Sequence, residues 1–126
     1  MDIEQARKLI ESKIKKRGYQ IFYRTSNSGC VFEKSKKCFI PKARGRSSLY
    51  LICHELFHTL RDKPSSIKTY INEMLAEKFA MRYMQHLGFS VPRKHITRAK
   101  RYISWKILKA QRRGLKRIDP KVKKWL

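Results

Sequence analysis

The amino-acid sequence predicts an α+β fold in which a small antiparallel sheet packs against two central helices, with a basic helix at the C-terminal end. Three observations support this class. Apolar residues recur at helical spacing in four segments, short aromatic and β-branched runs lie between the first two segments, and 126 residues suffice for one core. We therefore expect a main domain over residues 1–92 and a basic helical extension over residues 93–126 that packs on the same domain.

The N-terminal third is expected to hold one helix followed by the whole sheet. The helix should span residues 2–17, because its apolar side chains recur every three or four positions until Gly18 ends the pattern. Strands are then expected over residues 19–23, 30–32 and 38–40, separated by turn-forming residues. Short strands joined by short turns indicate antiparallel pairing.

The remainder of the chain is expected to be helical. After a basic loop, Ser47 or Ser48 can cap a helix that runs to about Arg61. A second helix should span residues 67–87, and a third should span residues 94–113.

The charge of the chain restricts its partners. Lys and Arg total 32 against 9 acidic residues, so the formal net charge is +23. Such a charge disfavours basic partners and cationic substrates, and it favours nucleic acid, an anionic membrane surface or an acidic protein. No apolar run is long enough to span a bilayer, and the chain begins with a charged helix. We therefore expect a cytoplasmic protein with neither a transmembrane segment nor a signal peptide.

Residues 54–58 read His-Glu-Leu-Phe-His, a pattern to which helical geometry gives a chemical meaning. Residues four apart lie on one face of a helix, so His54 and His58 can bind one tetrahedral cation. The carboxylate of Glu55 can then reach water that the metal activates. The apolar stripe of this helix lies on another side and consists of Leu49, Ile52, Cys53, Leu56 and Leu60. The histidines are thus expected to face a cleft.

A catalytic zinc site usually has three protein ligands, and the next predicted helix offers two carboxylates. Glu73 and Glu77 lie one turn apart, on the same face as the small or apolar residues Ala76, Ala80, Met84 and Leu87. Carboxylates on such a face are costly to bury unless they are paired or bind a metal. We expect this pair to complete the metal site.

The pattern His54-Glu55-x-x-His58, followed by Asn72-Glu73-x-x-Ala76, resembles the gluzincin zinc metallopeptidases. The small size and the element order are also similar to the minimal phage and bacterial metallopeptidases of the ImmA/IrrE group, in which the second helix carries an acidic-Ala stretch ending in Phe-Ala, as Phe79-Ala80 does here. The resemblance covers roughly residues 19–88. It implies a zincin-like fold, a zinc ion, hydrolysis of peptide bonds and a repressor-type protein substrate, and it is compatible with a phage or viral origin.

Carried over residue by residue, the resemblance implies that His54, His58 and Glu73 bind zinc and that Glu55 is the general base. Glu77 would then hold a ligand histidine in orientation through a hydrogen bond. A longer spacing that is common among gluzincins would select Glu77 as the ligand instead. We prefer Glu73 because of the Asn-Glu-x-x-Ala match. No third histidine follows shortly after His58, which argues against a metzincin-type site.

The last predicted helix is strongly basic on one side. The basic side carries Lys94, Arg98, Arg101, Lys109 and Arg112, with Trp105 among them, and the apolar side carries Ile96, Ala99, Ile103, Ile107 and Ala110. The basic side is expected to contact phosphate groups with little sequence preference, and Trp105 is expected to stack on an exposed base. A solvated basic face and an anionic membrane surface are the alternatives.

Together these patterns predict a zinc-dependent peptidase that acts on a nucleic-acid-associated protein such as a repressor. The basic extension makes the chain similar to the SprT family, which digests proteins on DNA. The alternative is a nucleic-acid-binding protein with a structural or degenerate zinc site, although a structural site has no need of Glu55. The sequence does not assign the residue that stabilises the oxyanion; the candidates are Tyr70, Tyr83 and His86 near the second helix and His95 at the start of the next one.

Overall fold

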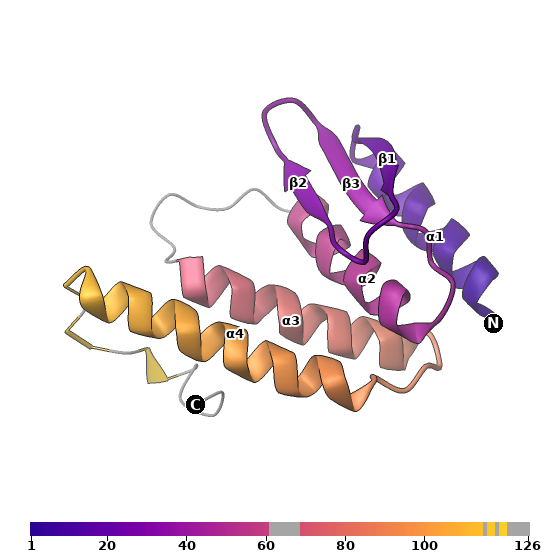
Figure 1. The fold of residues 1–126 in the computed structure, drawn as a ribbon. Coiled ribbons are helices and arrows are strands. Elements are labelled where there is room, and N and C mark those ends of the chain that lie inside the picture. Colours follow the sequence, from indigo (N-terminus) through magenta and orange to yellow (C-terminus); the bar gives the residue numbers. More distant parts are fainter. Residues whose placement is uncertain (61–68, 115, 118, 121–126) are drawn as a thin grey trace.

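The structure is a computed structural model that describes residues 1–60, 69–114, 116–117 and 119–120. These residues form four helices and three strands that follow the predicted order (Figure 1). The helices are α1 (Ile3–Lys16), α2 (Arg46–Leu60), α3 (Thr69–His86) and α4 (Arg93–Arg112), and the strands are β1 (Gln20–Arg24), β2 (Cys30–Phe32) and β3 (Lys37–Pro41). The α+β class is confirmed. The predicted end of α2 at Arg61 and the predicted start of α3 at residue 67 lie outside the described residues.

The sheet is mixed, and the prediction of a purely antiparallel sheet is wrong. Its strand order is β1-β3-β2, in which β2 and β3 are antiparallel but β1 and β3 run parallel. The reason lies in the connection over residues 25–29, which leads the chain past the position beside β1. Strand β2 therefore lies two strand positions from β1, and β3 fills the gap between them. Strand propensities alone do not distinguish this path from a simple meander.

One face of the sheet packs on α1 and α2 and forms the main core. Alternate side chains of β3 point to opposite faces, and Cys38 and Ile40 on the inner face are fully buried. The buried partners from the helices are Ala6, Ile10 and Ile14 of α1, Leu49, Ile52, Cys53 and Leu56 of α2, and Ala80 and Met84 of α3. Leu60 was predicted to share the α2 stripe but is 39% exposed, because it is the last residue of the helix and lies beyond this core.

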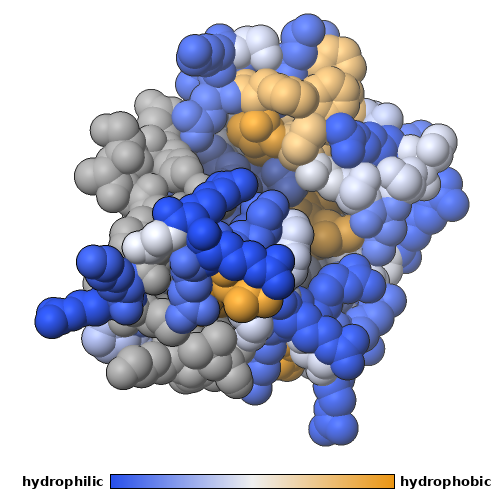
Figure 2. All heavy atoms as spheres, turned by 60° about the vertical axis from the view of Figure 1, so that its left-hand side comes forward, coloured by the Kyte–Doolittle hydropathy of each residue, from blue (hydrophilic) through white to orange (hydrophobic). Residues whose placement is uncertain are grey.

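The outer face of the sheet carries an aromatic cluster. The ring of Phe39 lies 5.1 Å from that of Phe22 and 5.7 Å from that of Phe32. Phe32 is 51% exposed. Figure 2 shows hydrophobic side chains gathered at the level of the sheet, above a surface of strongly hydrophilic side chains. The sheet therefore places its buried side toward the helices and leaves its aromatic side accessible.

Helix α4 packs along α3 and forms a second, smaller core. Ala99, Ile103 and Ile107 of α4 are buried against Tyr70 and Met74 of α3. No helix in the described ranges combines the length and the apolar character needed to cross a bilayer.

The buried stripe of α4 starts one residue earlier than the helical wheel predicted. His95 is 2% exposed, whereas Ile96 is 36% exposed. His95 continues the four-residue spacing of Ala99 and Ile103, which are buried against α3. Ile96 lies outside this row of residues.

Helix α2 starts at Arg46, so neither Ser47 nor Ser48 precedes it as a cap. The hydroxyl of Ser48 accepts hydrogen bonds from the backbone N–H groups of Arg44 (2.9 Å) and Gly45 (3.3 Å), and it thus secures the turn before the helix. The hydroxyl of Ser47 lies 2.7 Å from Nε2 of His95 and ties the start of α2 to the start of α4.

Replacing Ile103 by alanine should lower the free energy of unfolding by about 2–5 kcal/mol, because a cavity opens between α3 and α4. The matched control is Ile96→Ala, which should change this free energy by less than about 0.5 kcal/mol because the site is at the surface. Urea denaturation followed by circular dichroism measures both values. Equal losses would show that Ile96 packs as the helical wheel predicted.

Candidate metal centre

The centre is formed where α2 and α3 pack side by side (Figure 1). Ala76 and Ala80 of α3 are fully buried, and their small side chains let the two helices approach closely. This approach brings the carboxylate of Glu73 to the two imidazoles of α2. His54, His58 and Glu73 each offer one ligand atom, and these three atoms lie within 4.8 Å of one another. The group could hold a metal ion.

The distances within this group are short enough for its donor atoms to share one metal ion. Nε2 of His54 lies 3.2 Å from Nε2 of His58. The two oxygens of Glu73 lie 3.2 Å from Nε2 of His54 and 3.7 Å from Nε2 of His58. Ligand bonds of 2.0–2.2 Å in a tetrahedral site put neighbouring ligand atoms about 3.3 Å apart. The two imidazole nitrogens and the Glu73 carboxylate therefore lie close enough together to hold one metal ion.

The electrostatics of the group favour a bound cation. Burial by itself lowers the pKa of His54, but the hydrogen bonds to Glu73 and Glu77 outweigh it and raise the pKa to about 10. Burial acts to raise the pKa of Glu73, but the hydrogen bonds with His54 and His58 hold this pKa well below its usual range. The carboxylate is thus ionised, and a metal ion would take the place of the proton on His54.

Glu77 contacts the opposite side of the His54 ring. Its Oε1 lies 3.1 Å from Nδ1 of His54, while its Oε2 accepts a hydrogen bond from the hydroxyl of Tyr50. This arrangement fixes the ring so that Nε2 points toward His58 and Glu73. Of the two competing assignments, the geometry favours Glu73 as the ligand and Glu77 as the residue that orients His54.

Tyr50 is a part of the centre that sequence reasoning missed. Its side chain is almost fully buried, and its ring stacks on that of His95 at a centroid distance of 4.5 Å. The sequence does contain a signal, because Tyr50 lies four residues before His54 and therefore on the same face of α2. This spacing alone does not predict the role of Tyr50, because its hydrogen-bond partner Glu77 lies on another helix.

Glu55 projects from α2 toward Gly29, just before β2, and it is 7% exposed. Burial raises its pKa, and the positive charges of His54 and His58 act against this rise. Gly29, just before β2, makes room for the side chain: a Cβ atom there would lie 2.8 Å from Cγ of Glu55 and 2.9 Å from the carbonyl oxygen of Phe39. The sequence predicts only a turn at Gly29, between the strands expected over residues 19–23 and 30–32.

The aromatic and histidine candidates for an oxyanion donor are dispersed. Tyr70 is buried in the α3–α4 core, the ring of Tyr83 stacks on Phe79, and His86 is exposed. His95 is held by Ser47 at the start of α2. Tyr102 of α4, which sequence analysis did not name, has its pKa raised to about 12 by burial and by the charges of Glu73, Glu77 and Glu55. Its phenol is therefore within electrostatic range of the centre.

The basic residues predicted on α4 face outward. Lys94, Arg98, Arg101 and Arg112 are exposed, and Lys109 is half-buried. Trp105 is 49% exposed, and the ammonium group of Lys109 lies 4.3 Å from the centre of its ring. The basic side of α4 is thus a solvent-facing surface, as a contact with phosphate groups requires.

Comparison of the chain with protein-family models, with curated proteins and with solved structures finds no match. The resemblance to gluzincins therefore rests on the motif residues, and zincin-like packing stays a prediction.

Removing either carboxylate separates the two assignments. Glu73→Ala should abolish zinc binding, because it removes a ligand, whereas Glu77→Ala should weaken it about 10–100-fold by freeing the His54 ring. Chelator competition measures the affinities, and Glu4→Ala, which removes an exposed carboxylate of α1, serves as the control. A zinc-loaded Glu73 variant beside a metal-free Glu77 variant would reverse the assignment.

Proposed function

We propose that this protein is a zinc-dependent peptidase that hydrolyses peptide bonds. One observation carries the proposal: two imidazoles and one carboxylate converge at the spacing of a three-ligand zinc site. The buried carboxylate of Glu55, adjacent in sequence to the first histidine, provides the base that such a site needs.

The roles of the chain's own residues follow from their contacts. Bound zinc would lower the pKa of a water molecule toward about 7. Glu55 would accept a proton of that water and then deliver it to the leaving amine, and burial raises the pKa of this carboxyl group, which favours its uptake of a proton. Glu77 and Tyr50 hold His54 in position throughout.

A structural zinc site in a nucleic-acid-binding protein is the competing function. Such a site needs a fourth protein ligand that closes the metal. Glu77 contacts His54 and is a candidate for that role, but both of its oxygens are engaged, one by Nδ1 of His54 and the other by Tyr50. This engagement supports an open, catalytic site over a closed one.

The substrate class is proposed from the charge of the protein. The exposed basic side of α4 would hold the enzyme on nucleic acid, and the substrate would be a protein bound to the same nucleic acid, such as a repressor. The resemblance to ImmA/IrrE-like and SprT-like peptidases supports this substrate class.

The proposal predicts separate losses for the ligands and the base. Purified protein should hold about one zinc ion per chain, His54→Ala should lose it, and Glu55→Gln should keep metal and fold but lose peptidase activity. Metal analysis and cleavage of a quenched fluorescent peptide library measure these outcomes. His86→Ala, which removes an exposed histidine of α3, and Glu4→Gln are the matched controls. Undiminished hydrolysis by the Glu55 variant would refute the assigned base.

A further inference from the structure

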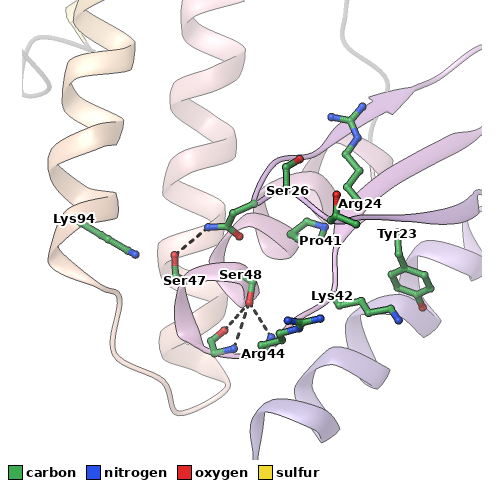
Figure 3. Close-up of a pocket in the computed structure, with 12 residues that line it drawn as sticks. Tyr23, Arg24, Ser26, Pro41, Lys42, Arg44, Ser47, Ser48 and Lys94 are labelled. Carbon is green, nitrogen blue, oxygen red and sulfur yellow. Dashed lines mark hydrogen bonds between the residues drawn. The ribbon is translucent and has the colours of Figure 1, made fainter.

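A hollow of about 890 Å³ lies at the N-terminal end of α2. It is enclosed by the β1–β2 connection, by the loop between β3 and α2, and by the start of α4 (Figure 3). Its volume is within the range of about 300–1,000 Å³ that is typical of ligand sites. None of the residues of the metal centre lines it, and Ser47 at its wall precedes His54 by about two helical turns. The hollow is therefore a second candidate site.

The lining of the hollow is cationic. Arg24 comes from β1, Lys42 and Arg44 from the loop before α2, and Lys94 from α4. None of the twelve lining residues is acidic, and within the described part of the chain Lys42, Arg44 and Lys94 form no ion pair. Like charges around one hollow repel one another, and a bound anion would relieve this repulsion.

A cationic side chain and polar side chains meet in the hollow at the start of α2. Figure 3 shows Lys94 extending from α4 toward Ser47, whose hydroxyl lies 3.4 Å from the side-chain nitrogen of Asn27. The start of α2 adds the partial positive charge of a helix N-terminus. The positive field also reaches His95, since burial and the charges of Arg98 and Lys94 lower the pKa of its imidazole. Cationic side chains of this kind recognise phosphate oxygens.

Two observations point to a strand of nucleic acid as the source of the phosphate. Lys94 lies in the hollow and also begins the basic side of α4, which continues through the exposed residues Arg98 and Arg101. A bound chain of phosphates could therefore run from the hollow along α4. Tyr23 also lines the hollow and is 45% exposed; its hydroxyl donates to Glu11, and the ammonium group of Lys42 lies 5.8 Å from the centre of its ring, where a base would stack in place of that ammonium group.

We propose that this hollow binds backbone phosphates of a nucleic-acid strand, which then continues along the basic side of α4. The inference rests on the proposed association with nucleic acid and is independent of the peptidase chemistry. Lys42, Arg44 and Lys94 contact the phosphates. Arg24 has a structural role in addition, because its guanidinium contacts Ser28 and Cys30 and lies 5.2 Å from the centre of the Phe39 ring.

The test is the binding of a labelled single-stranded oligonucleotide to the full chain, followed by fluorescence anisotropy over a range of salt concentrations. The pocket variant carries Lys42→Gln, Arg44→Gln and Lys94→Gln, and the matched control carries Lys13→Gln, Lys16→Gln and Lys34→Gln, three exposed lysines outside the hollow. Each single-strand phosphate contact contributes about −0.7 to the log–log salt slope, so the pocket variant should flatten the slope by about two units and the control by much less. Thermal melting of both variants should match that of the wild type.

A third variant, with Arg98→Gln, Arg101→Gln and Arg112→Gln, measures the contribution of the basic side of α4 to binding while the residues that line the hollow stay unchanged. Loss of slope in both the pocket and the α4 variants supports one continuous path. If only the α4 variant loses salt slope, the proposal for the hollow is wrong and the association with nucleic acid stands. If the wild type does not bind the oligonucleotide, both are wrong. If inorganic phosphate, a mononucleotide or phosphatidylserine vesicles bind the hollow in place of the strand, with the same loss in the pocket variant, the assignment to nucleic acid is wrong.

Discussion

The contact between α2 and α3 is the constraint on which the site depends. Two imidazoles of α2 and two carboxylates of α3 lie in one largely buried interface, where an isolated charge would be strongly unfavourable. The small residues Ala76 and Ala80 permit the approach, and the pairing of His54 with Glu73 and Glu77 makes the burial of these charges tolerable. The same contacts that let the helices pack thus set the donor atoms at the spacing of a metal site.

Helix α2 links the metal centre to the other parts of the fold. Its inner side packs on the sheet, where Gly29 at the start of β2 leaves the space that Glu55 fills. Its first turn is tied to α4 by the pair Ser47 and His95, and Tyr50 stacks on the same histidine while its hydroxyl binds Glu77. One helix therefore carries two of the three candidate ligands, the proposed base and a wall of the cationic hollow.

The charge distribution supports two separate tasks for the two ends of α2. Three of the nine acidic residues of the chain, Glu55, Glu73 and Glu77, gather at the metal centre. The lining of the hollow at the helix start is cationic instead. A cation would be drawn to one end and phosphate to the other. The proposed peptidase and the proposed strand-binding site are therefore compatible within one small domain.

The sequence by itself determined the features that depend on a single segment. Helical periodicity placed His54 and His58 on one face, put both Glu73 and Glu77 on one side of the next helix, and predicted the element order. Only the tertiary structure decided the features that depend on distances between segments: the parallel pairing of β1, the burial of His95 in place of Ile96, the contact of Glu77 with Nδ1 of His54, and the hollow formed by three separate segments. The physical reason is that side-chain direction within a helix or strand follows from local backbone geometry, whereas the distance between two elements depends on how all their buried faces pack together.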